Sequence, residues 1–142
     1  DVLAAIALVQ LDKLPEHTAA RERQFALYDE GIARLDGIEP LARDARDTHA
    51  RHLYVVRVDE SRFGQTRDEL QQALAAERIS TSIHFLPVHR LTWYRERFPE
   101  QPPLPVAERA GDEILSLPLS PAHSDADIAD VLEALERIRG RS

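Results

Sequence analysis

Apolar residues at helical spacing fill the first quarter of the chain. Residues 2–11 (VLAAIALVQL) are apolar on nearly every side, which is typical of a helix buried on several faces. A second apolar face, with spacings of three and four, begins at Phe25 and ends at Leu35, just before Gly37. This pattern predicts an amphipathic helix that follows the buried one.

Two pairs of polar residues predict where later helices begin. Thr66 and Glu69 stand three residues apart ahead of an apolar face, so they form a capping box for a helix over residues 67–78. Ser124 and Asp127 have the same spacing and predict the start of the last helix. The adjacent residues His123, Ser124 and Asp125 suggest a serine hydrolase, but neighbours in sequence cannot form the geometry of a catalytic triad, and Ser124 is better used as a cap.

Short segments between the helices have the composition of strands. Residues 52–58 (HLYVVRV) are β-branched and aromatic, which predicts a strand buried on both faces. Residues 79–85 (ISTSIHF) alternate strictly, which predicts a half-buried strand with His84 on its polar face. Residues 115–121 (LSLPLSP) predict a brief strand and a turn. The expected fold class is α+β, a small and mostly antiparallel sheet of two to four strands covered by helices.

Composition narrows the classes of function. The chain has 142 residues, of which 43% are hydrophobic, and this is enough for one domain with its own core. With 18 basic and 25 acidic residues the net charge is −7, and no basic patch gathers, so we expect no nucleic acid partner. No apolar stretch reaches the length of about 18 residues that a membrane span requires.

Three residue types are absent or nearly so. The lack of cysteine excludes disulfides, thiolate catalysis and cysteine-ligated zinc, and we expect a cytoplasmic protein. The lack of methionine, even at position 1, leads us to expect a piece of a longer protein. Lys13 is the single lysine, and so it is the one candidate for chemistry that needs an amine nucleophile.

The histidines near the middle of the chain are the main candidates for a site. His84 and His89 lie close together in residues 79–90, where they would supply neutral donors and acceptors at the end of a strand. A surface role for His84, or a zinc site completed by His49 and His52, are the alternatives. Because a spacing of five fits no compact ligand pattern, we expect no metal site.

The aromatic and basic residues that follow have two interpretations. Trp93 and Tyr94 either stack on a base or sugar or pack against the protein. Arg95 and Arg97 either bind phosphates or belong to a solvated, charged turn. The residues alone leave both questions open.

Six segments resemble, in order, the C-terminal third of the DegT/DnrJ/EryC1/StrS family, the pyridoxal-phosphate (PLP) sugar aminotransferases. The stretch HRLTWYRERFP is most similar to the members that make UDP-4-amino-4-deoxy-L-arabinose. The resembling segments are DVLAAIALVQLDKL, HLYVVRV, RDELQQALAAERISTSIHFLPVH, YRERFP, LPVAERAGDEILSLPLSP and SDADIADVLEAL.

The resemblance implies the small C-terminal domain of a fold-type-I PLP-dependent transferase. Residues 1–142 would form this domain, with 1–36 as the long helical segment that connects to a missing PLP domain and 50–142 as the α/β part. The family is dimeric and transfers an amino group, usually from glutamate, to the keto carbon of a nucleotide sugar. A UDP-4-keto sugar is the expected substrate.

The resemblance also assigns roles to individual residues. It implies that His84 and Phe85 lie near the substrate and that His89 lies at the rim, where they select and orient the sugar. The family's Schiff-base lysine and phosphate-binding residues precede this segment, and Lys13 matches an ordinary helix lysine. We therefore expect no catalytic or cofactor-binding residue and no activity of this chain alone. The alternative is a stand-alone binding or dimerisation module that keeps the fold.

Overall fold

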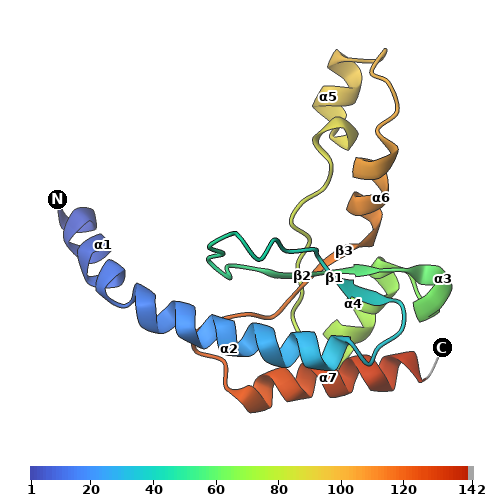
Figure 1. Cartoon of the computed structure of the whole chain (residues 1–142). Helices are drawn as coiled ribbons and strands as arrows, with labels where there is room; N and C mark the ends of the chain where they lie inside the picture. The colour runs from blue at the N-terminus through green and yellow to red at the C-terminus, as the bar shows by residue number, and fades with distance from the viewer. Residues whose placement is uncertain (141–142) are drawn as a thin grey trace.

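The computed structural model describes residues 1–140. Helices dominate, and the strands are short, as Figure 1 shows. In chain order the elements are α1 (Val2–Asp12), α2 (Leu14–Ile32), β1 (Ile38–Pro40), β2 (Tyr54–Val58), α3 (Glu60–Phe63), α4 (Arg67–Ala76), the 3-10 helix η1 (Val88–Arg90), α5 (Thr92–Arg97), α6 (Pro105–Glu113), β3 (Ile114–Leu117) and α7 (Asp125–Arg139).

The strands form one antiparallel sheet in the order β1-β2-β3. Ile38 pairs with Val58 across β1 and β2, and Arg57 pairs with Ile114 across β2 and β3. This arrangement confirms the predicted α+β class and the small antiparallel sheet. Residues of β2 alternate between buried and half-buried, so the prediction that both faces of this strand are buried was wrong. The fully buried face of β2 is the one that carries Tyr54, Val56 and Val58 into the core.

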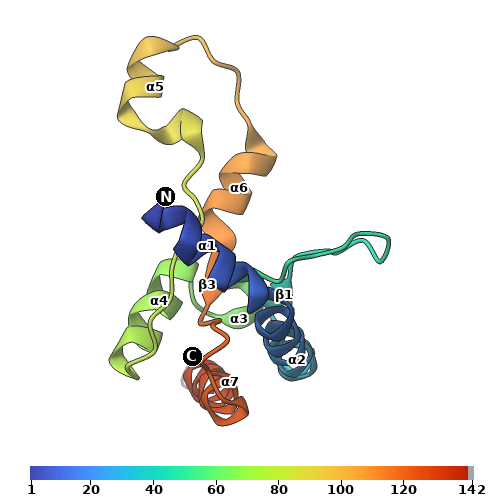
Figure 2. The ribbon, with the colours of Figure 1, turned by 90° about the vertical axis from the view of Figure 1, so that its left-hand side faces the viewer.

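Helices α2 and α7 lie side by side against the sheet, an arrangement visible in both ribbon views (Figures 1 and 2). Gly31 of α2 lets them approach closely, because an added Cβ would run into the side chain of Leu132 on α7. Buried apolar side chains from the sheet and the surrounding helices form one core: Phe25, Tyr28, Ile32, Leu35, Ile38, Tyr54, Val56, Val58, Phe63, Leu70, Leu74, Leu115, Leu117, Ile128, Val131, Ala134, Leu135 and Ile138.

Both predicted capping boxes are confirmed. In α4 the Thr66 hydroxyl accepts from the Glu69 amide at 3.2 Å, and the Glu69 carboxylate accepts from the Thr66 amide at 2.8 Å. The Thr66 amide and hydroxyl both donate to the Glu69 carboxylate, and these two hydrogen bonds lower the pKa of Glu69. In α7 the Ser124 hydroxyl accepts from the Asp127 amide, and the Asp127 carboxylate accepts from the Ser124 amide at 2.7 Å.

We expect Ser124→Ala to lower the free energy of unfolding by about 1 kcal/mol, because the first turn of α7 loses its cap. Urea denaturation followed by circular dichroism measures the change. Ser80→Ala is the matched control, since Ser80 is exposed and makes no side-chain hydrogen bond within residues 1–140. Equal losses in the two variants would contradict the prediction.

The predicted strand over residues 79–85 is reduced to a single bridge between Ser82 and Ser116 of β3. The Ser82 amide donates to the Ser116 carbonyl at 3.2 Å, and the Ser116 amide donates back at 2.8 Å. Beyond this bridge the predicted faces are reversed, because His84 is half-buried whereas Phe85 is 75% exposed. The strand prediction was wrong because, within this segment, Ser82 alone pairs with β3.

Two apolar parts of the chain project from the core. Helix α1 forms as predicted, but none of its residues is buried within this chain, contrary to the expected burial on several sides. The second part, which we call the arm, comprises residues 85–105 and carries η1 and α5 away from the sheet (Figures 1 and 2). Among residues 1–140, no helix is long and apolar enough to cross a membrane.

Candidate functional site

His84 lies against the edge of the sheet. Its Nδ1 atom is 2.8 Å from the hydroxyl oxygen of Ser116, which is buried in β3. The ring of Phe85 meets the His84 ring edge-on, with the two centroids 4.9 Å apart. The half-buried imidazole therefore has a fixed orientation, and the aromatic ring beside it faces solvent.

The base of the arm lies against α6, where one arginine–aspartate pair holds it. His89 Nε2 lies 3.4 Å from a carboxylate oxygen of Glu108. The Arg90 guanidinium contacts both carboxylate oxygens of Asp112, with the second contact at 2.9 Å, and this pairing lowers the pKa of Asp112. His89 thus lies against α6 as part of η1, whose next residue, Arg90, is paired with this helix.

A glycine makes this close docking possible. An added Cβ on Gly111 of α6 would run into the ring of Pro87, so the helix backbone packs directly on the segment that follows Phe85. The segment from His84 to His89 is consequently anchored at one end on β3 and at the other on α6. The three predicted site residues, His84, Phe85 and His89, belong to this anchored segment.

We expect Gly111→Val to displace the base of the arm while leaving the core folded, because the valine side chain collides with Pro87 at the surface of α6. Amide spectra of the labelled chain would show shifts confined to the arm and α6. Gly140→Val is the control, since its Cβ meets nothing closer than 3.5 Å. Shifts spread evenly over β1 and β2 would contradict this expectation.

The histidines of the alternative zinc site lie elsewhere. His49 and His52 belong to the loop between β1 and β2, where they line a hollow of about 790 Å³ together with Phe25. The ring of His49 is 6.0 Å from that of Phe25, and neither His84 nor His89 lines this hollow. In the part of the chain that the structure describes, no three His, Asp or Glu side chains gather as a metal site would require.

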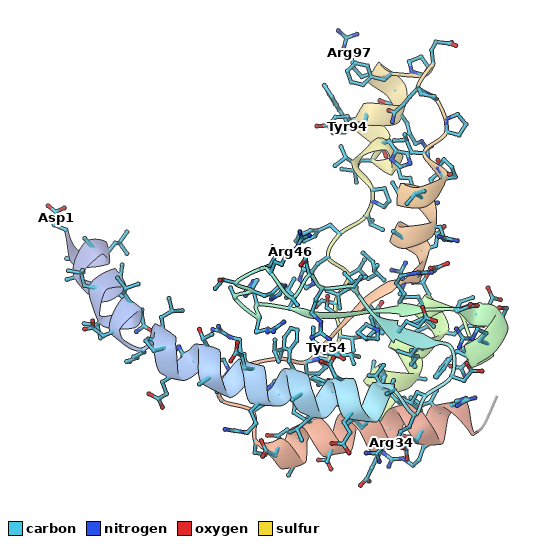
Figure 3. The ribbon with its side chains drawn as sticks, in the orientation of Figure 1. Asp1, Arg34, Arg46, Tyr54, Tyr94 and Arg97 are labelled. Carbon is cyan, nitrogen blue, oxygen red and sulfur yellow. The ribbon has the colours of Figure 1, made fainter. Side chains whose placement is uncertain are left out.

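The aromatic residues of the arm contact one another at its tip (Figure 3). The Trp93 ring lies 5.0 Å from that of Tyr94, and the Tyr94 ring stacks on Phe98 at 6.4 Å. The Arg97 guanidinium lies 6.0 Å from the centre of the Phe98 ring. All four side chains are exposed, so the tip of the arm has an aromatic and basic surface.

Sequence reasoning missed the residues that hold the site in place. Ser116 falls in a segment that carried the family resemblance, but no pattern singles it out as a partner of His84. Glu108 and Gly111 lie on α6, and the apolar pattern of this helix does not predict which segment packs against it. The contacts of all three depend on how the chain returns to the sheet after the arm.

Residues 1–136 match the model of the DegT/DnrJ/EryC1/StrS aminotransferase family. The chain belongs to this family. Its structure is similar to that of the aminotransferase TlmJ from Streptoalloteichus hindustanus, with 32% identity and a TM-score of 0.85 over 97% of this chain and 36% of that chain. It is also similar to DesI in the presence of its TDP-sugar product, with 35% identity and a TM-score of 0.87 over 97% of this chain and 35% of that chain.

A third similar structure is that of DesV from S. venezuelae in complex with a ketimine intermediate, with 31% identity and a TM-score of 0.85 over 98% of this chain and 36% of that chain. The family member therefore spans about a third of the length of the structures it matches. Membership of the subgroup that makes UDP-4-amino-4-deoxy-L-arabinose stays a prediction.

The family uses PLP, and Spr1654 from Streptococcus pneumoniae was solved in a PLP-form. The residues of this chain do not fit that cofactor. Lys13 is the single amine side chain, and it lies exposed at the junction of α1 and α2. A lysine that holds PLP needs surroundings that make its amine reactive, such as an apolar pocket, whereas Lys13 is exposed.

Proposed function

We propose that this family member is the C-terminal domain of a PLP-dependent sugar-nucleotide aminotransferase. The proposed reaction moves an amino group from glutamate to a keto sugar nucleotide, for which a UDP-4-keto sugar is the candidate. The observation that carries the proposal is the family match over residues 1–136, together with an anchored histidine segment. PLP, when bound, supplies the chemistry of amino-group transfer.

The proposed domain organisation follows from what the chain leaves exposed. Residues 1–36 would connect to a PLP domain, and 50–142 would form the small domain. The exposed apolar residues of α1 support this, because a surface of this kind is typical of an interface. We further propose that the complete enzyme is a cytoplasmic homodimer and that this chain alone is inactive.

The chain's own residues would bind the sugar rather than transfer protons. Phe85 offers an exposed aromatic face, which suits the apolar face of a sugar ring. His84 offers one ring nitrogen beyond its contact with Ser116, and His89 lies at the rim beside Glu108. Together they would select and orient the sugar so that its keto carbon reaches groups held outside this chain.

The test of this role is His84→Ala in the longer protein that carries this chain. We expect the KM for the keto sugar nucleotide to rise about tenfold, which corresponds to about 1.4 kcal/mol, the worth of one lost hydrogen bond. The KM for glutamate should stay unchanged. Ser80→Ala is the matched control. A protein that transfers no amino group to any keto sugar nucleotide would overturn the proposed function and favour a stand-alone module.

The exposed lysine gives a second test. We expect Lys13→Arg in the longer protein to leave kcat and KM unchanged, because the reactive amine would lie outside this chain. Arginine keeps the positive charge but cannot form the covalent link to PLP. Loss of activity in this variant would show that the assignment of the catalytic lysine to another segment is wrong.

A further inference from the structure

Ser116 occupies an unusually well-defined place in β3. It pairs with Val55 of β2 on one side and exchanges two backbone hydrogen bonds with Ser82 on the other. Only 3% of its surface is exposed. The hydroxyl of Ser116 is therefore fixed by the sheet, and the imidazole of His84 is the group that approaches it, at 2.8 Å.

The hydrogen between these two atoms can belong to either group, and the two arrangements are not equivalent. If His84 Nδ1 carried the hydrogen, the Ser116 hydroxyl would accept it and would need another acceptor for its own hydrogen. Within residues 1–140, the Ser116 hydroxyl has no second hydrogen-bond partner. If the Ser116 hydroxyl donates to Nδ1 instead, the hydroxyl hydrogen has an acceptor, and no buried donor is left unpaired.

We propose that Ser116 is a positioning residue that holds His84 as the tautomer with its hydrogen on Nε2. The edge-on contact with Phe85 supports the same geometry, because it restricts rotation of the imidazole about the bond that joins Cβ to the ring. The Nε2–H group then points away from the buried hydroxyl. His84 thereby becomes a hydrogen-bond donor at the surface of the site.

This assignment defines the class of ligand atom that His84 recognises. A neutral imidazole with hydrogen on Nε2 donates to an oxygen acceptor and cannot accept a hydrogen bond at that atom. Resting on the proposed function, the acceptor is a keto or hydroxyl oxygen of the sugar. A ligand that presents a donor at this position, such as the amino group of the aminated product, would be held less well by His84.

The tautomer can be measured directly in the 142-residue chain by two-bond nitrogen–proton correlation spectra of the histidine rings, with His84→Gln used to assign the signals. We expect a pyridine-type shift for Nδ1 and a pyrrole-type shift for Nε2 of His84. In Ser116→Ala both shifts should move toward averaged values, and in Ser116→Thr, which keeps the hydroxyl, they should stay as in the parent chain.

Ser82→Ala is the matched control, because Ser82 contacts Ser116 through backbone atoms and should leave the His84 signals in place. A pyrrole-type Nδ1 in the parent chain would overturn the proposal even if Ser116→Ala failed to fold. Unchanged His84 shifts in a folded Ser116→Ala chain would also overturn it.

Kinetics of the longer protein separate this proposal from the proposed function. Ser116→Ala should raise the KM for the keto sugar nucleotide about as much as His84→Ala, with kcat nearly unchanged and with recovery in Ser116→Thr. The absence of aminotransfer by the parent protein would overturn the proposed function but not the tautomer. A normal KM in Ser116→Ala would overturn the role of the tautomer in binding while leaving the activity established.

Discussion

Replacing Gly37 with alanine is expected to lower the free energy of unfolding by about 3 kcal/mol. Gly37 follows α2 with a φ of +84°, a conformation that costs other residues about 1 kcal/mol or more. The added Cβ would also run into the backbone nitrogen of Phe63 and lie 2.7 Å from its Cα. Because backbone at the end of α3 cannot move aside as a side chain can, the strain adds to the conformational cost.

Chemical denaturation of the purified chain measures this loss. Gly140→Ala is the matched control, because Gly140 has a helical φ of −68° and an added Cβ would meet nothing closer than 3.5 Å. That substitution should change stability by less than about 0.5 kcal/mol. If both variants lost equal stability, the left-handed conformation and the contact with Phe63 would not be the cause.

Above pH 10 the protein is expected to lose stability steeply because of two buried tyrosines. The Tyr28 hydroxyl donates to the Pro118 carbonyl at 2.7 Å, and burial raises the pKa of Tyr28 far above its usual value. The Tyr54 hydroxyl donates to Asp29 at 2.7 Å. Burial, followed by the hydrogen bond and the negative charge of Asp29, raises the pKa of Tyr54 in the same direction.

The direction of the effect follows from which state keeps its protons. Above pH about 10 the unfolded chain loses the phenol protons, whereas the folded chain retains them until its higher pKa values are reached. Each tyrosine therefore contributes stability that is fully present below pH 10 and is lost as the pH rises. The expected slope is about 1.4 kcal/mol per pH unit for each tyrosine, or about 2.8 kcal/mol per pH unit for both.

Denaturation midpoints between pH 9 and pH 12 would give this slope. Tyr28→Phe should roughly halve it, and it should also lower stability at neutral pH by a constant amount, because the Pro118 carbonyl loses its donor. Tyr54→Phe should halve the slope in the same way. Stability that stays level up to pH 12 in the parent chain would contradict the burial of these hydroxyls.

The helices of this fold were predictable from local patterns. Thr66 with Glu69 and Ser124 with Asp127 form their caps with neighbours three residues away, so sequence spacing alone determines the contacts. The apolar face that begins at Phe25 likewise packs into the core as its period indicates. Such features need no knowledge of the rest of the chain.

The segment over residues 79–85 shows where local patterns fail. Its strict alternation is that of a strand, but a strand needs a partner of matching length, and β3 offers only Ser116 to this segment. The reversal at His84 follows from its contact with Ser116, which lies far away in sequence. His84, Phe85 and His89 were identified as candidates, but what fixes them was not.

The pairing of Arg57 with Ile114 joins two strands that are far apart in sequence. The long connection between them contains α4, the histidine segment and the arm. The entropic cost of closing such a loop grows only slowly, by about 0.6 kcal/mol for each doubling of its length. Insertions or deletions at the tip of the arm would therefore cost the scaffold little. The length of the arm can therefore change in evolution while the core around the sheet stays the same.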